Sequence, residues 1–487
     1  MQAAKLWIDG RFTEAASGAR YAVPNPATEE TLGHAPDAGL EDLERALVAA
    51  RRAFDEGPWP RAPREARAHA LLRIADRLER RKGEMRALLV AETGAAQLTH
   101  GIQVDAPIEH LRHHAELVRG FVFDEALPPR ASQGPLGSQL NSTLVHRQPV
   151  GVCAMIPTWN FPAYVFVQKL APALAAGCTM VFKPSPWGPL INCFLAEILA
   201  EADLPPGVVN VVTSQSPAIA EALVRDPRVD KVSFTGSVHV GRKIVEASAG
   251  SLKRVHLELG GKSVGIYLDG DDDPMHPIVA CGPAMFHAGQ GCAMATRVLV
   301  PKARHDAFVE KMVGFVQGMV TVGDPADPAT MLGPVIRPER REAIERHIAA
   351  GVDEGATLAT GGKRPAHLAR GWFLEPTVFC NVQNSQRIAQ EEIFGPVVAV
   401  IPFADEDEAI RIANDSSYGL AGAIYAKDTA RAVALAQRIR TGVVWVNGGL
   451  NMLDGPFGGF KESGLGREGG RWGLEEFTEI QQVTWRA

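Results

Sequence analysis

Apolar and polar residues follow two different periods along this chain. Over residues 40–54, and again over residues 60–93, apolar side chains recur at helical spacing. Beyond Val150 the long periodic segments give way to short apolar runs separated by helical stretches. We therefore expect a short strand-like start, one amphipathic helix and one or two more in the first part, and buried strands with intervening helices afterwards.

The alternation after Val150 predicts an α/β fold with a parallel, doubly wound sheet, which binds ligands at the carboxyl ends of its strands. The expected strands cover residues 150–156, 179–182, 208–212 and 232–234, and the expected helices cover 167–176, 190–202 and 218–224. A second α/β region follows, with helices at 303–319, 338–351 and 406–414 and strands near 298–300, 397–401 and 443–446.

One segment, residues 132–146, fits neither period. Prolines and glycines precede and interrupt it, and only residues 143–145 resemble a strand. We expect a hairpin arm that extends out of its domain. The tail at residues 480–485 alternates like a strand and is expected to pair with the edge of another one.

The composition narrows the class of protein. A chain of 487 residues is too long for one compact core, so two or three domains are expected. The net charge of -6 argues against nucleic acid or an anionic membrane as the main partner. The amino-terminal segment has no signal-peptide core and no apolar run is long enough to span a bilayer, so we expect a cytoplasmic protein.

The six cysteines are scattered and form no CxxC pair. In a chain of this length they are expected to be reduced thiols rather than a disulfide framework. No cluster of ligand residues has the spacing of a structural zinc site, so no metal is expected.

Two residues next to glycines have the chemistry of a covalent catalyst. Cys292 follows Gly289, Gln290 and Gly291, and Glu258 precedes Leu259-Gly260-Gly261 at the end of an apolar run. A thiol can attack a carbonyl, and a carboxylate whose pKa is raised by burial can activate water. Each residue taken alone has a plainer interpretation, a buried small side chain for Cys292 and a surface carboxylate for Glu258.

A strand-to-helix turn contains Gly236, Ser237 and Gly241. Free backbone N–H groups at a helix start suit a pyrophosphate, although the full GxGxxG fingerprint is absent and the segment is equally compatible with an ordinary turn.

Three further segments carry polar or aromatic groups beside strand ends. Asn160 offers an N–H donor for an oxyanion or, alternatively, a cap for the next helix. Lys183 ends a strand, where it can bond ribose hydroxyls or phosphate or can simply be solvated. Glu392 and Phe394 lie beside a turn, or else end a helix with the ring in the core.

Together these segments resemble the aldehyde dehydrogenase superfamily, in motif order and in the spacing between Glu258 and Cys292. The resemblance extends over nearly the whole chain, from Trp7 to Glu479. It includes Glu392-Ile393-Phe394-Gly395-Pro396 and Pro456-Phe457-Gly458-Gly459-Phe460-Lys461-Glu462-Ser463-Gly464.

The resemblance implies a role for each matched residue. Cys292 would be the nucleophile and Glu258 the general base, Asn160 would share the oxyanion hole with the Cys292 N–H, and Lys169 and Glu468 would relay protons. Glu392 would bind the nicotinamide ribose and Phe394 would pack by the nicotinamide. The other expected cofactor positions are Ile156, Thr158, Trp159, Lys183, Ser185, Gly236, Ser237, Gly241 and Leu259, and those lining the substrate pocket are Phe161, Val165, Phe286, Asn451 and Phe457.

The same resemblance implies three parts: a Rossmann-like NAD(P)-binding domain (residues 1–124 and 149–258), a catalytic domain (259–455) and a small β oligomerisation arm (125–148 and 470–487). It implies a homodimer or homotetramer. The expected reaction is oxidation of an aldehyde to the carboxylic acid through a cysteine thiohemiacetal and a thioester, and the pocket residues favour an uncharged aliphatic or aromatic aldehyde.

Two departures from the family pattern bear on the cofactor. Many relatives that use NAD carry Glu where this chain has Pro186, so NAD is only slightly favoured and NADP stays open. A Gly-x-Gly of many relatives is here Ser214-Gln215-Ser216, so the adenine side is expected to differ in shape. Two rival functions are a non-catalytic family member and a thiol hydrolase that pairs Cys292 with His287 and uses no nucleotide.

Overall fold

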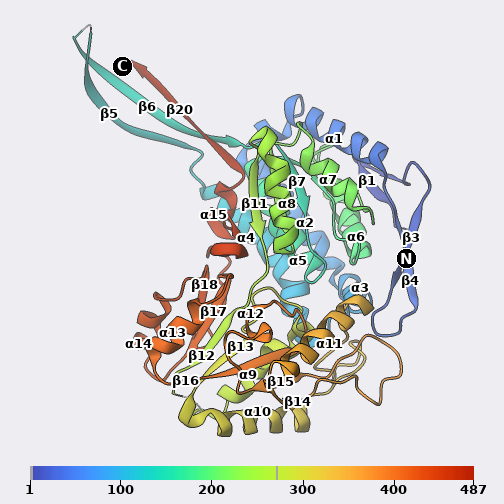
Figure 1. The fold of residues 1–487 in the computed structure, drawn as a ribbon. Coiled ribbons are helices and arrows are strands. Elements are labelled where there is room, and N and C mark those ends of the chain that lie inside the picture. The colour runs from blue at the N-terminus through green and yellow to red at the C-terminus, as the bar shows by residue number, and fades with distance from the viewer. Residues whose placement is uncertain (1–3, 136, 270–271, 487) are drawn as a thin grey trace.

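The computed structural model describes residues 4–135, 137–269 and 272–486. Met1–Ala3, which begin the amino-terminal segment, Leu136 of the expected arm, and Ala487 at its far end lie outside the described residues. Within the described part, the strands form an eight-stranded, a seven-stranded and a three-stranded sheet beside the two-stranded ribbon of β3 (Arg20–Pro24) and β4 (Thr31–Pro36) (Figure 1). The α/β fold predicted from the alternation is confirmed.

The first sheet has a parallel centre in the order β11-β10-β7-β8-β9. These strands are β7 (Val152–Ile156), β8 (Thr179–Phe182), β9 (Val209–Val211), β10 (Lys231–Thr235) and β11 (Arg254–Glu258). The edges are antiparallel and consist of β1 (Leu6–Ile8) with β2 (Arg11–Thr13), and of β19 (Gly464–Leu465). Strand order reverses beside β7, so a ligand crevice is expected where β7 and β10 end.

Helices cover both faces of this sheet: α1 (Leu40–Asp55), α2 (Arg64–Arg80), α3 (Lys82–Thr93), α4 (Ala106–Gly120), α5 (Pro162–Ala176), α6 (Pro189–Ala200), α7 (Pro217–Arg225) and α8 (Val238–Ser248). Helix α5 starts at Pro162, before the expected residue 167, because proline fits the first turn of a helix. The sequence pattern did not predict α4, since His110 and His114 replace aliphatic residues on its buried side.

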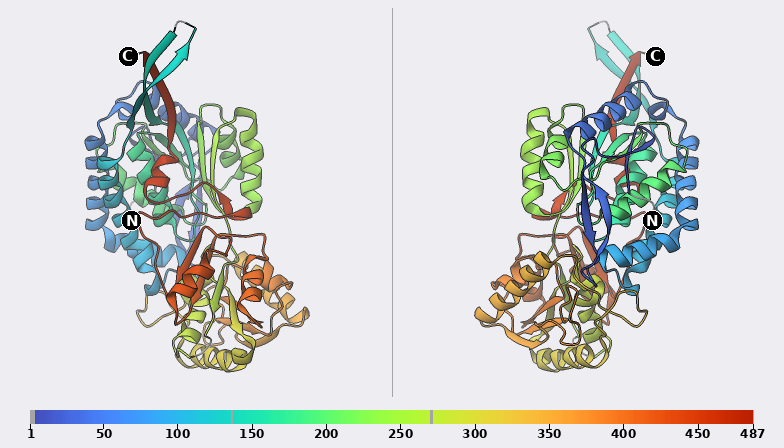
Figure 2. Two further views of the ribbon diagram at one scale, coloured as in Figure 1. Left: turned by 90° about the vertical axis from the view of Figure 1, so that its left-hand side faces the viewer. Right: turned by 90° about the vertical axis from the view of Figure 1, so that its right-hand side faces the viewer.

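The second sheet has the order β14-β15-β16-β13-β12-β17-β18 and is parallel except for β14. Figure 2 shows it as a separate body below the first sheet. Its strands are β12 (Val264–Tyr267), β13 (Arg297–Pro301), β14 (Thr357–Thr360), β15 (Thr377–Cys380), β16 (Val397–Phe403), β17 (Ala421–Tyr425) and β18 (Val443–Val446). Its helices are α9 (His276–Met285), α10 (His305–Met319), α11 (Pro338–Asp353), α12 (Arg387–Gln390), α13 (Glu406–Asn414) and α14 (Thr429–Ala436).

One short connection joins the two sheets. Strand β11 ends at Glu258 and β12 begins at Val264, so the glycine motif spans the gap. Ser463 holds this crossover: its hydroxyl donates to the Gly260 carbonyl at 2.8 Å, and its own carbonyl accepts from the Leu259 N–H at 2.9 Å. The site residues at 258–262 are thereby fixed between two rigid sheets.

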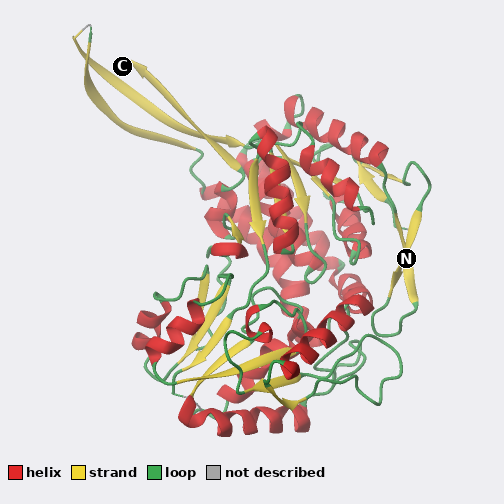
Figure 3. Ribbon diagram, viewed as in Figure 1, coloured by secondary structure: helices red, strands yellow, loops and turns green. Residues whose placement is uncertain are grey.

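The arm is a three-stranded antiparallel sheet of β5 (Asp124–Gly134), β6 (Gly137–Pro149) and β20 (Thr478–Arg486) (Figure 3). It extends away from the body of the molecule, and its apolar side chains Leu127, Leu140, Ile480, Val483 and Trp485 are exposed. The preceding helix α15 (Gly470–Glu475) packs against α5 and α4 instead.

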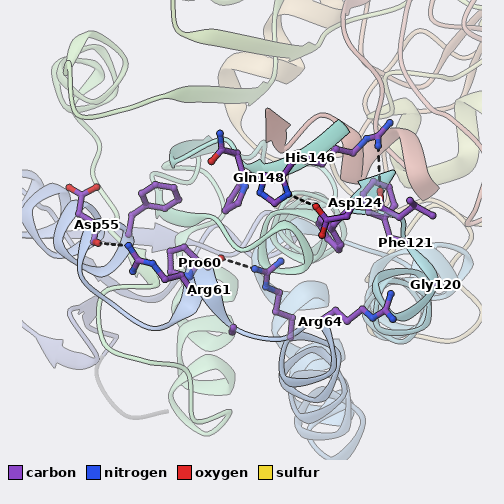
Figure 4. A pocket seen from close by; sticks show the side chains of 16 residues that line it. Asp55, Pro60, Arg61, Arg64, Gly120, Phe121, Asp124, His146 and Gln148 are labelled. Atoms are coloured by element: carbon purple, nitrogen blue, oxygen red, sulfur yellow. Dashed lines mark hydrogen bonds and ion pairs between the residues drawn. The ribbon is translucent and has the colours of Figure 1, made fainter. Parts of the chain in front are cut away.

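A cavity of about 930 Å³ lies at the root of the arm (Figure 4). Arg61, Arg64, Asp124, His146 and Gln148 are among the residues that line it, and none of the expected catalytic or cofactor residues does. Among residues 4–135, 137–269 and 272–486, no helix is both long and apolar enough to cross a membrane, and no group of three or more His, Cys, Asp and Glu side chains could hold a metal ion.

Candidate active site

Three segments far apart in the sequence meet at Gly260 and Gly261. A Cβ atom on Gly261 would lie 2.5 Å from the Cys292 carbonyl oxygen, and one on Gly260 would lie 2.2 Å from a Glu392 carboxylate oxygen. The Gly261 N–H donates to that carboxylate at 3.0 Å. Only glycine allows both approaches, so the motif beside Glu258 is where the cysteine loop and the Glu392 segment come together.

The loop that carries Cys292 is closely held. His287 and Ala288 have left-handed backbone conformations, with φ of 49° and 50°. Gln290 is fully buried; its side chain donates to the His287 carbonyl at 3.0 Å and accepts from the Ile336 N–H at 2.9 Å. Cys292 itself is partly exposed, whereas the other five cysteines are buried. Cys292 is therefore the least buried of the six cysteines, and it sits on a fixed backbone.

Glu258 ends β11 and is buried, and neither of its carboxylate oxygens has a hydrogen-bond partner among the described residues. Burial raises its pKa well above the usual range, and the negative charge of Glu468 raises it further; Cys292 and Lys169 act in the opposite direction. A desolvated carboxylate without donors is a stronger base than one in water. The interpretation of Glu258 as a surface carboxylate is wrong.

Burial also raises the pKa of the Cys292 thiol well above its usual range, and the negative charges of Glu258 and Glu392 add to that shift. The resting residue at neutral pH is thus a thiol rather than a thiolate.

Asn160 does not cap the next helix. It is buried, and its Nδ2 donates to the Gln290 carbonyl at 2.9 Å, while its Oδ1 has no partner in the part of the chain described. The N-cap position of α5 is Phe161, without a side-chain cap. The Asn160 amide therefore points at the cysteine loop, two residues from Cys292, and not at α5.

The loops after β7 and β8 lie at the expected crevice. Ile156 is buried, and Thr158 and Trp159 are half-buried. Lys183 is buried too; desolvation lowers its pKa to about 8, and Asp37 opposes that shift. The Ser185 N–H donates to the Pro157 carbonyl at 3.1 Å, which ties the β7 and β8 loops together.

The turn from β10 into α8 has the shape of an anion cradle. Ser237 is the N-cap, and its hydroxyl accepts from the Val240 N–H. A Cβ on Gly236 would lie 2.3 Å from the Phe234 ring, and one on Gly241 would lie 2.8 Å from the buried Leu259. Because these glycines have no side chains, the start of α8 can lie close to the sheet. The free N–H groups of its first turn fit the pyrophosphate of a dinucleotide.

Glu392 contacts the glycine motif, and Phe394 contacts the loop after β7. Burial raises the pKa of Glu392 to about 7, and Gly261, Arg340 and Lys262 act against that shift. Phe394 has a left-handed backbone (φ 54°), and its ring lies edge-on to Trp159 with 5.4 Å between centroids. The ring therefore packs against the loop after β7 and is only half-buried, unlike a core residue at a helix end.

A buried ion pair lies next to Glu258. Lys169 Nζ donates to Glu468 Oε1 at 2.8 Å and to Ser233 Oγ at 3.0 Å, and the lysine is fully buried. Ser233 Oγ lies 3.4 Å from His256 Nδ1. Ser233 and His256 were not predicted, because their contact depends on the register of β10 and β11 rather than on a local pattern.

The five residues expected at the substrate pocket are less closely grouped. The Phe161 and Phe286 rings approach to 6.2 Å, and Val165 is buried one turn later on α5. Phe457 exchanges two backbone hydrogen bonds of 2.7 Å with Glu468. Asn451 is exposed and accepts from Trp445 Nε1 at 3.0 Å. Tyr164, which the sequence analysis did not select, is the one residue of α5 that is not buried.

His287 does not resemble the partner of a thiol hydrolase. Its ring lies against Phe161 at 5.4 Å, both ring nitrogens are buried without a hydrogen bond among the described residues, and burial lowers its pKa to about 4. A catalytic base must reach the thiol or be oriented by a third group.

Comparison with known proteins identifies the relatives of this chain. Residues 12–483 match the model of the "Aldehyde dehydrogenase family". The chain is 42% identical over 482 residues to geranial dehydrogenase of Castellaniella defragrans (98% of each chain covered) and 37% identical to betaine aldehyde dehydrogenase of Bacillus subtilis (98% and 96% covered). A solved structure of a mutant of aldehyde dehydrogenase C from Pseudomonas syringae, in complex with NAD+ and octanal, superposes with a TM-score of 0.93 at 38% identity, covering 99% of this chain and 96% of the other.

The exposure and charge of Cys292 predict how it reacts with iodoacetamide. Under native conditions the reagent should modify Cys292 first, because the other cysteines are buried. The rate should rise with pH, since the thiol pKa is raised. Glu258→Gln removes a negative neighbour and should make alkylation at pH 9 several-fold faster. Peptide mapping with Cys292→Ala as control measures this, and preferential labelling of a different cysteine would contradict it.

Proposed function

The chain belongs to the aldehyde dehydrogenase family, and we propose that it oxidises an aldehyde to the carboxylic acid with NAD+ or NADP+ through a thioester on Cys292. One observation carries the proposal: the buried carboxylate of Glu258 lies close enough to the Cys292 thiol for each group to shift the pKa of the other. A nucleophile and a base of raised pKa are the two groups that a covalent oxidation followed by hydrolysis requires.

In the first step the Cys292 thiol gives its proton to the neighbouring Glu258 carboxylate, and the sulfur attacks the aldehyde carbon. The carbonyl oxygen then becomes an oxyanion, and the donors proposed for it are the Asn160 side-chain amide and the Cys292 N–H. Asn160 is buried and already directed at the cysteine loop, so it needs little reorganisation. Donors of this kind are worth about 3 kcal/mol each in other enzymes.

A bound nicotinamide supplies the acceptor for the hydrogen and two electrons that leave the substrate carbon. The cradle at Gly236 and Ser237, the strand-end Lys183, and Glu392 with Phe394 are the groups proposed to hold the dinucleotide. Ile156, Thr158, Trp159, Ser185, Gly241 and Leu259 complete the set of proposed contacts.

Glu258 acts in the second half of the cycle. It removes a proton from water as the water oxygen attacks the thioester carbon, the C–S bond breaks, and the acid leaves. Its raised pKa makes the carboxylate a better proton acceptor. In the family branch that transfers the acyl group to coenzyme A this glutamate is usually missing, so its presence supports hydrolysis.

NAD+ is the slightly favoured cofactor. Pro186 removes the carboxylate that many NAD-using relatives place near the ribose, yet Asp37 lies close enough to Lys183 to act on its pKa. Asp37 is held there by the Ser214 hydroxyl and the Gln215 N–H, both at 2.9 Å. A negative charge beside Lys183 disfavours a 2′-phosphate, which supports NAD+ over NADP+.

An uncharged aliphatic or aromatic aldehyde is the proposed substrate. The Phe161–Phe286 pair and Val165 offer an apolar lining. Two relatives support an uncharged substrate: one is named for geranial, and another was solved in complex with octanal. A third relative is named for betaine aldehyde, which carries a positive charge.

The arm is proposed to join copies of the chain into a dimer or tetramer. A three-stranded sheet with Leu127, Leu140, Ile480, Val483 and Trp485 exposed has no core of its own, and such a surface marks an interaction site. The proposed division is a cofactor domain (1–124, 149–258), a catalytic domain (259–455) and an arm (125–148, 470–487), except that α15 (Gly470–Glu475) packs against α4 and α5, so β20 (Thr478–Arg486) is the carboxyl-terminal part of the arm. Six free cysteines support a cytoplasmic location.

Two substitutions test the reaction. Cys292→Ala should abolish turnover, because the nucleophile is lost. Glu258→Gln should keep the rapid first formation of reduced cofactor but lower the steady-state rate by about 100-fold, since general-base catalysis is typically worth that much or more. Stopped-flow absorbance of the reduced nicotinamide, with a panel of aldehydes and both cofactors, measures both effects. A Glu258→Gln enzyme with the wild-type steady-state rate would exclude the base role.

Cofactor preference can be tested by binding alone. Trp159 and Trp187 lie 5.5 Å apart beside the crevice, so their fluorescence should report the dinucleotide. NAD+ should bind more tightly than NADP+. Asp37→Asn should tighten NADP+ by about fivefold, the effect of removing roughly 1 kcal/mol of repulsion. Asp76→Asn on α2 serves as the control, and an unchanged NADP+ affinity in Asp37→Asn would rule out this role.

Light scattering tests the arm. The wild-type chain should have the mass of two or four copies, and the double variant Leu140→Glu/Trp485→Glu should shift it toward one copy because charges replace the exposed apolar side chains. Val48→Glu, which alters an exposed apolar residue of α1, is the matched control. A monomeric wild type, or an assembly unchanged in the double variant, would show that the arm does not join the copies.

A further inference from the structure

The cavity at the root of the arm lies apart from the candidate active site and has an unusual charge (Figure 4). It has a volume of about 930 Å³, and its walls come from the end of α1, the start of α2, the start of β5 and the end of β6. Four arginines and two carboxylates face it, in a chain whose net charge is -6. The charged side chains and the one histidine of the lining are Arg61, Arg64, Arg67, Arg147, Asp55, Asp124 and His146.

Both carboxylates of the cavity already have partners. Asp55 accepts two hydrogen bonds, of 2.9 and 2.7 Å, from the guanidinium of Arg51, which does not line the cavity. Asp124 Oδ1 lies 2.6 Å from His146 Nδ1. Among the described residues, neither carboxylate forms an ion pair with an arginine of the cavity. The positive charge of the four arginines is therefore not neutralised within the lining.

Two of the arginines have donors to spare. Arg61 donates to the backbone carbonyls of Asp55 and Gly57, at 3.2 and 3.4 Å. Arg147 approaches one carboxylate, that of Glu125 at 3.6 Å, which lies outside the lining. A guanidinium has five N–H donors, so both side chains can bond a ligand without giving up these contacts.

Arg67 is buried and has no carboxylate within ion-pair distance among the described residues. Its guanidinium donates to the Pro60 carbonyl at 2.8 Å and to the carbonyls of Ala175 and Ala176 at 3.2 and 2.9 Å. The last two carbonyls belong to the end of α5, so Arg67 also caps that helix. Its Nε has no hydrogen-bond partner in the part of the chain described, and burial lowers its pKa. An anion in the cavity would supply the opposite charge that Arg67 lacks.

The start of α2 adds backbone donors to the same wall. The first N–H group of this segment that bonds within the helix is that of Ala66, which donates to the Pro63 carbonyl, so the N–H groups of Arg64 and Glu65 remain free. The Arg64 side chain is exposed and has no hydrogen bond or ion pair among the described residues, and Glu65 is paired with Arg119 at 2.8 Å. The positive end of the α2 dipole therefore coincides with a free guanidinium.

The rest of the lining is partly aromatic. Phe54, Phe121 and Phe123 contribute rings to the cavity, and the rings of Phe121 and Phe123 lie 4.8 Å apart. The guanidinium of Arg67 lies 5.7 Å from the centroid of the Phe123 ring. The volume of the cavity falls within the range of small-molecule sites, about 300–1,000 Å³. The lining therefore suits a ligand with an anionic group and an apolar body.

We propose that this cavity binds a small organic anion, a carboxylate or phosphate group attached to an apolar body, at a site separate from the candidate active site. The anionic group is bonded by Arg61, Arg64 and Arg147, and the apolar body lies against the phenylalanine rings. The proposal does not depend on the function proposed above, because binding at the cavity can be measured whether or not an aldehyde is oxidised.

A bound anion would connect two parts of the molecule. Arg61 ends the short helix η1 (Trp59–Arg61) and Arg64 begins α2, whereas Arg147 belongs to β6 of the arm. Strand β6 ends at Pro149, and β7 of the first sheet begins three residues later at Val152. An anion bonded from both sides therefore fixes the arm to the first sheet and stabilises the folded enzyme.

The experiment is isothermal titration of the assembled enzyme with four probes. Octanoate and octyl phosphate present the two anionic groups on the same apolar chain and distinguish the two sources of the charge. Octan-1-ol lacks the charge, and inorganic phosphate lacks the chain. At least one of the two octyl anions should bind with an affinity about tenfold or more above that of octan-1-ol and of inorganic phosphate.

Substitutions on both walls locate the site. Arg64→Gln/Arg147→Gln should weaken binding of the octyl anion about tenfold or more, since charge-assisted hydrogen bonds are lost from both sides. Arg80→Gln, an exposed arginine at the opposite end of α2, is the matched control and should bind like the wild type. The octyl anion should also raise the Tm of the wild type and of Arg80→Gln, but not that of the double variant.

Three outcomes would overturn the proposal. The first is equal affinity for octan-1-ol and the octyl anions. The second is an affinity unchanged in Arg64→Gln/Arg147→Gln, which would place the bound anion at the candidate active site or the cofactor site. The third is absence of anion binding together with a lower mass of the double variant in light scattering, which would show that these arginines contact a second copy of the chain.

Discussion

The close approach of three chain segments at Gly260 and Gly261 is the constraint on which the site depends. The Cys292 carbonyl and the Glu392 carboxylate both occupy space that a side chain would fill. Because this crossover also joins the two sheets, the distance from Cys292 to Glu258 is set by the packing of whole domains rather than by a loop. A site on such rigid elements needs little reorganisation when charge develops.

Burial gives the same residues their chemistry. Glu258, Glu392 and Cys292 lie within electrostatic reach of one another, and each has a raised pKa. Three acidic groups at one place disfavour more than one negative charge. At rest, most of these three groups therefore hold a proton, which the reaction must later remove. A positive or polar ligand bound beside them would change which of the three groups is protonated.

Much of this fold could be predicted from the sequence, because parallel strands are continuous apolar runs. The expected boundaries coincide with those of the buried β8 and of the half-buried β18. The glycines beside Cys292 and Glu258 drew attention to these two residues in the sequence. The structure needs glycine there because other segments of the chain approach the backbone closely. Helix α4 escaped prediction because histidines interrupt its apolar face. Ser233 and His256 escaped it because their meeting depends on the register of two strands, which no local pattern encodes.

The burial that strengthens Glu258 as a base is shared by the charged side chains around it. Lys169 and Lys231 are both buried on this side of the sheet. Each forms an ion pair with a glutamate, which offsets the cost of removing the lysine from water. Buried ion pairs contribute little to stability, and apolar replacements are often as stable or more so. Two such pairs near the His256 imidazole are therefore poorly explained as a stabilising core. The Lys169–Glu468 pair has a clearer role in the electrostatics of the site, since Glu468 raises the pKa of Glu258 and Lys169 lowers it.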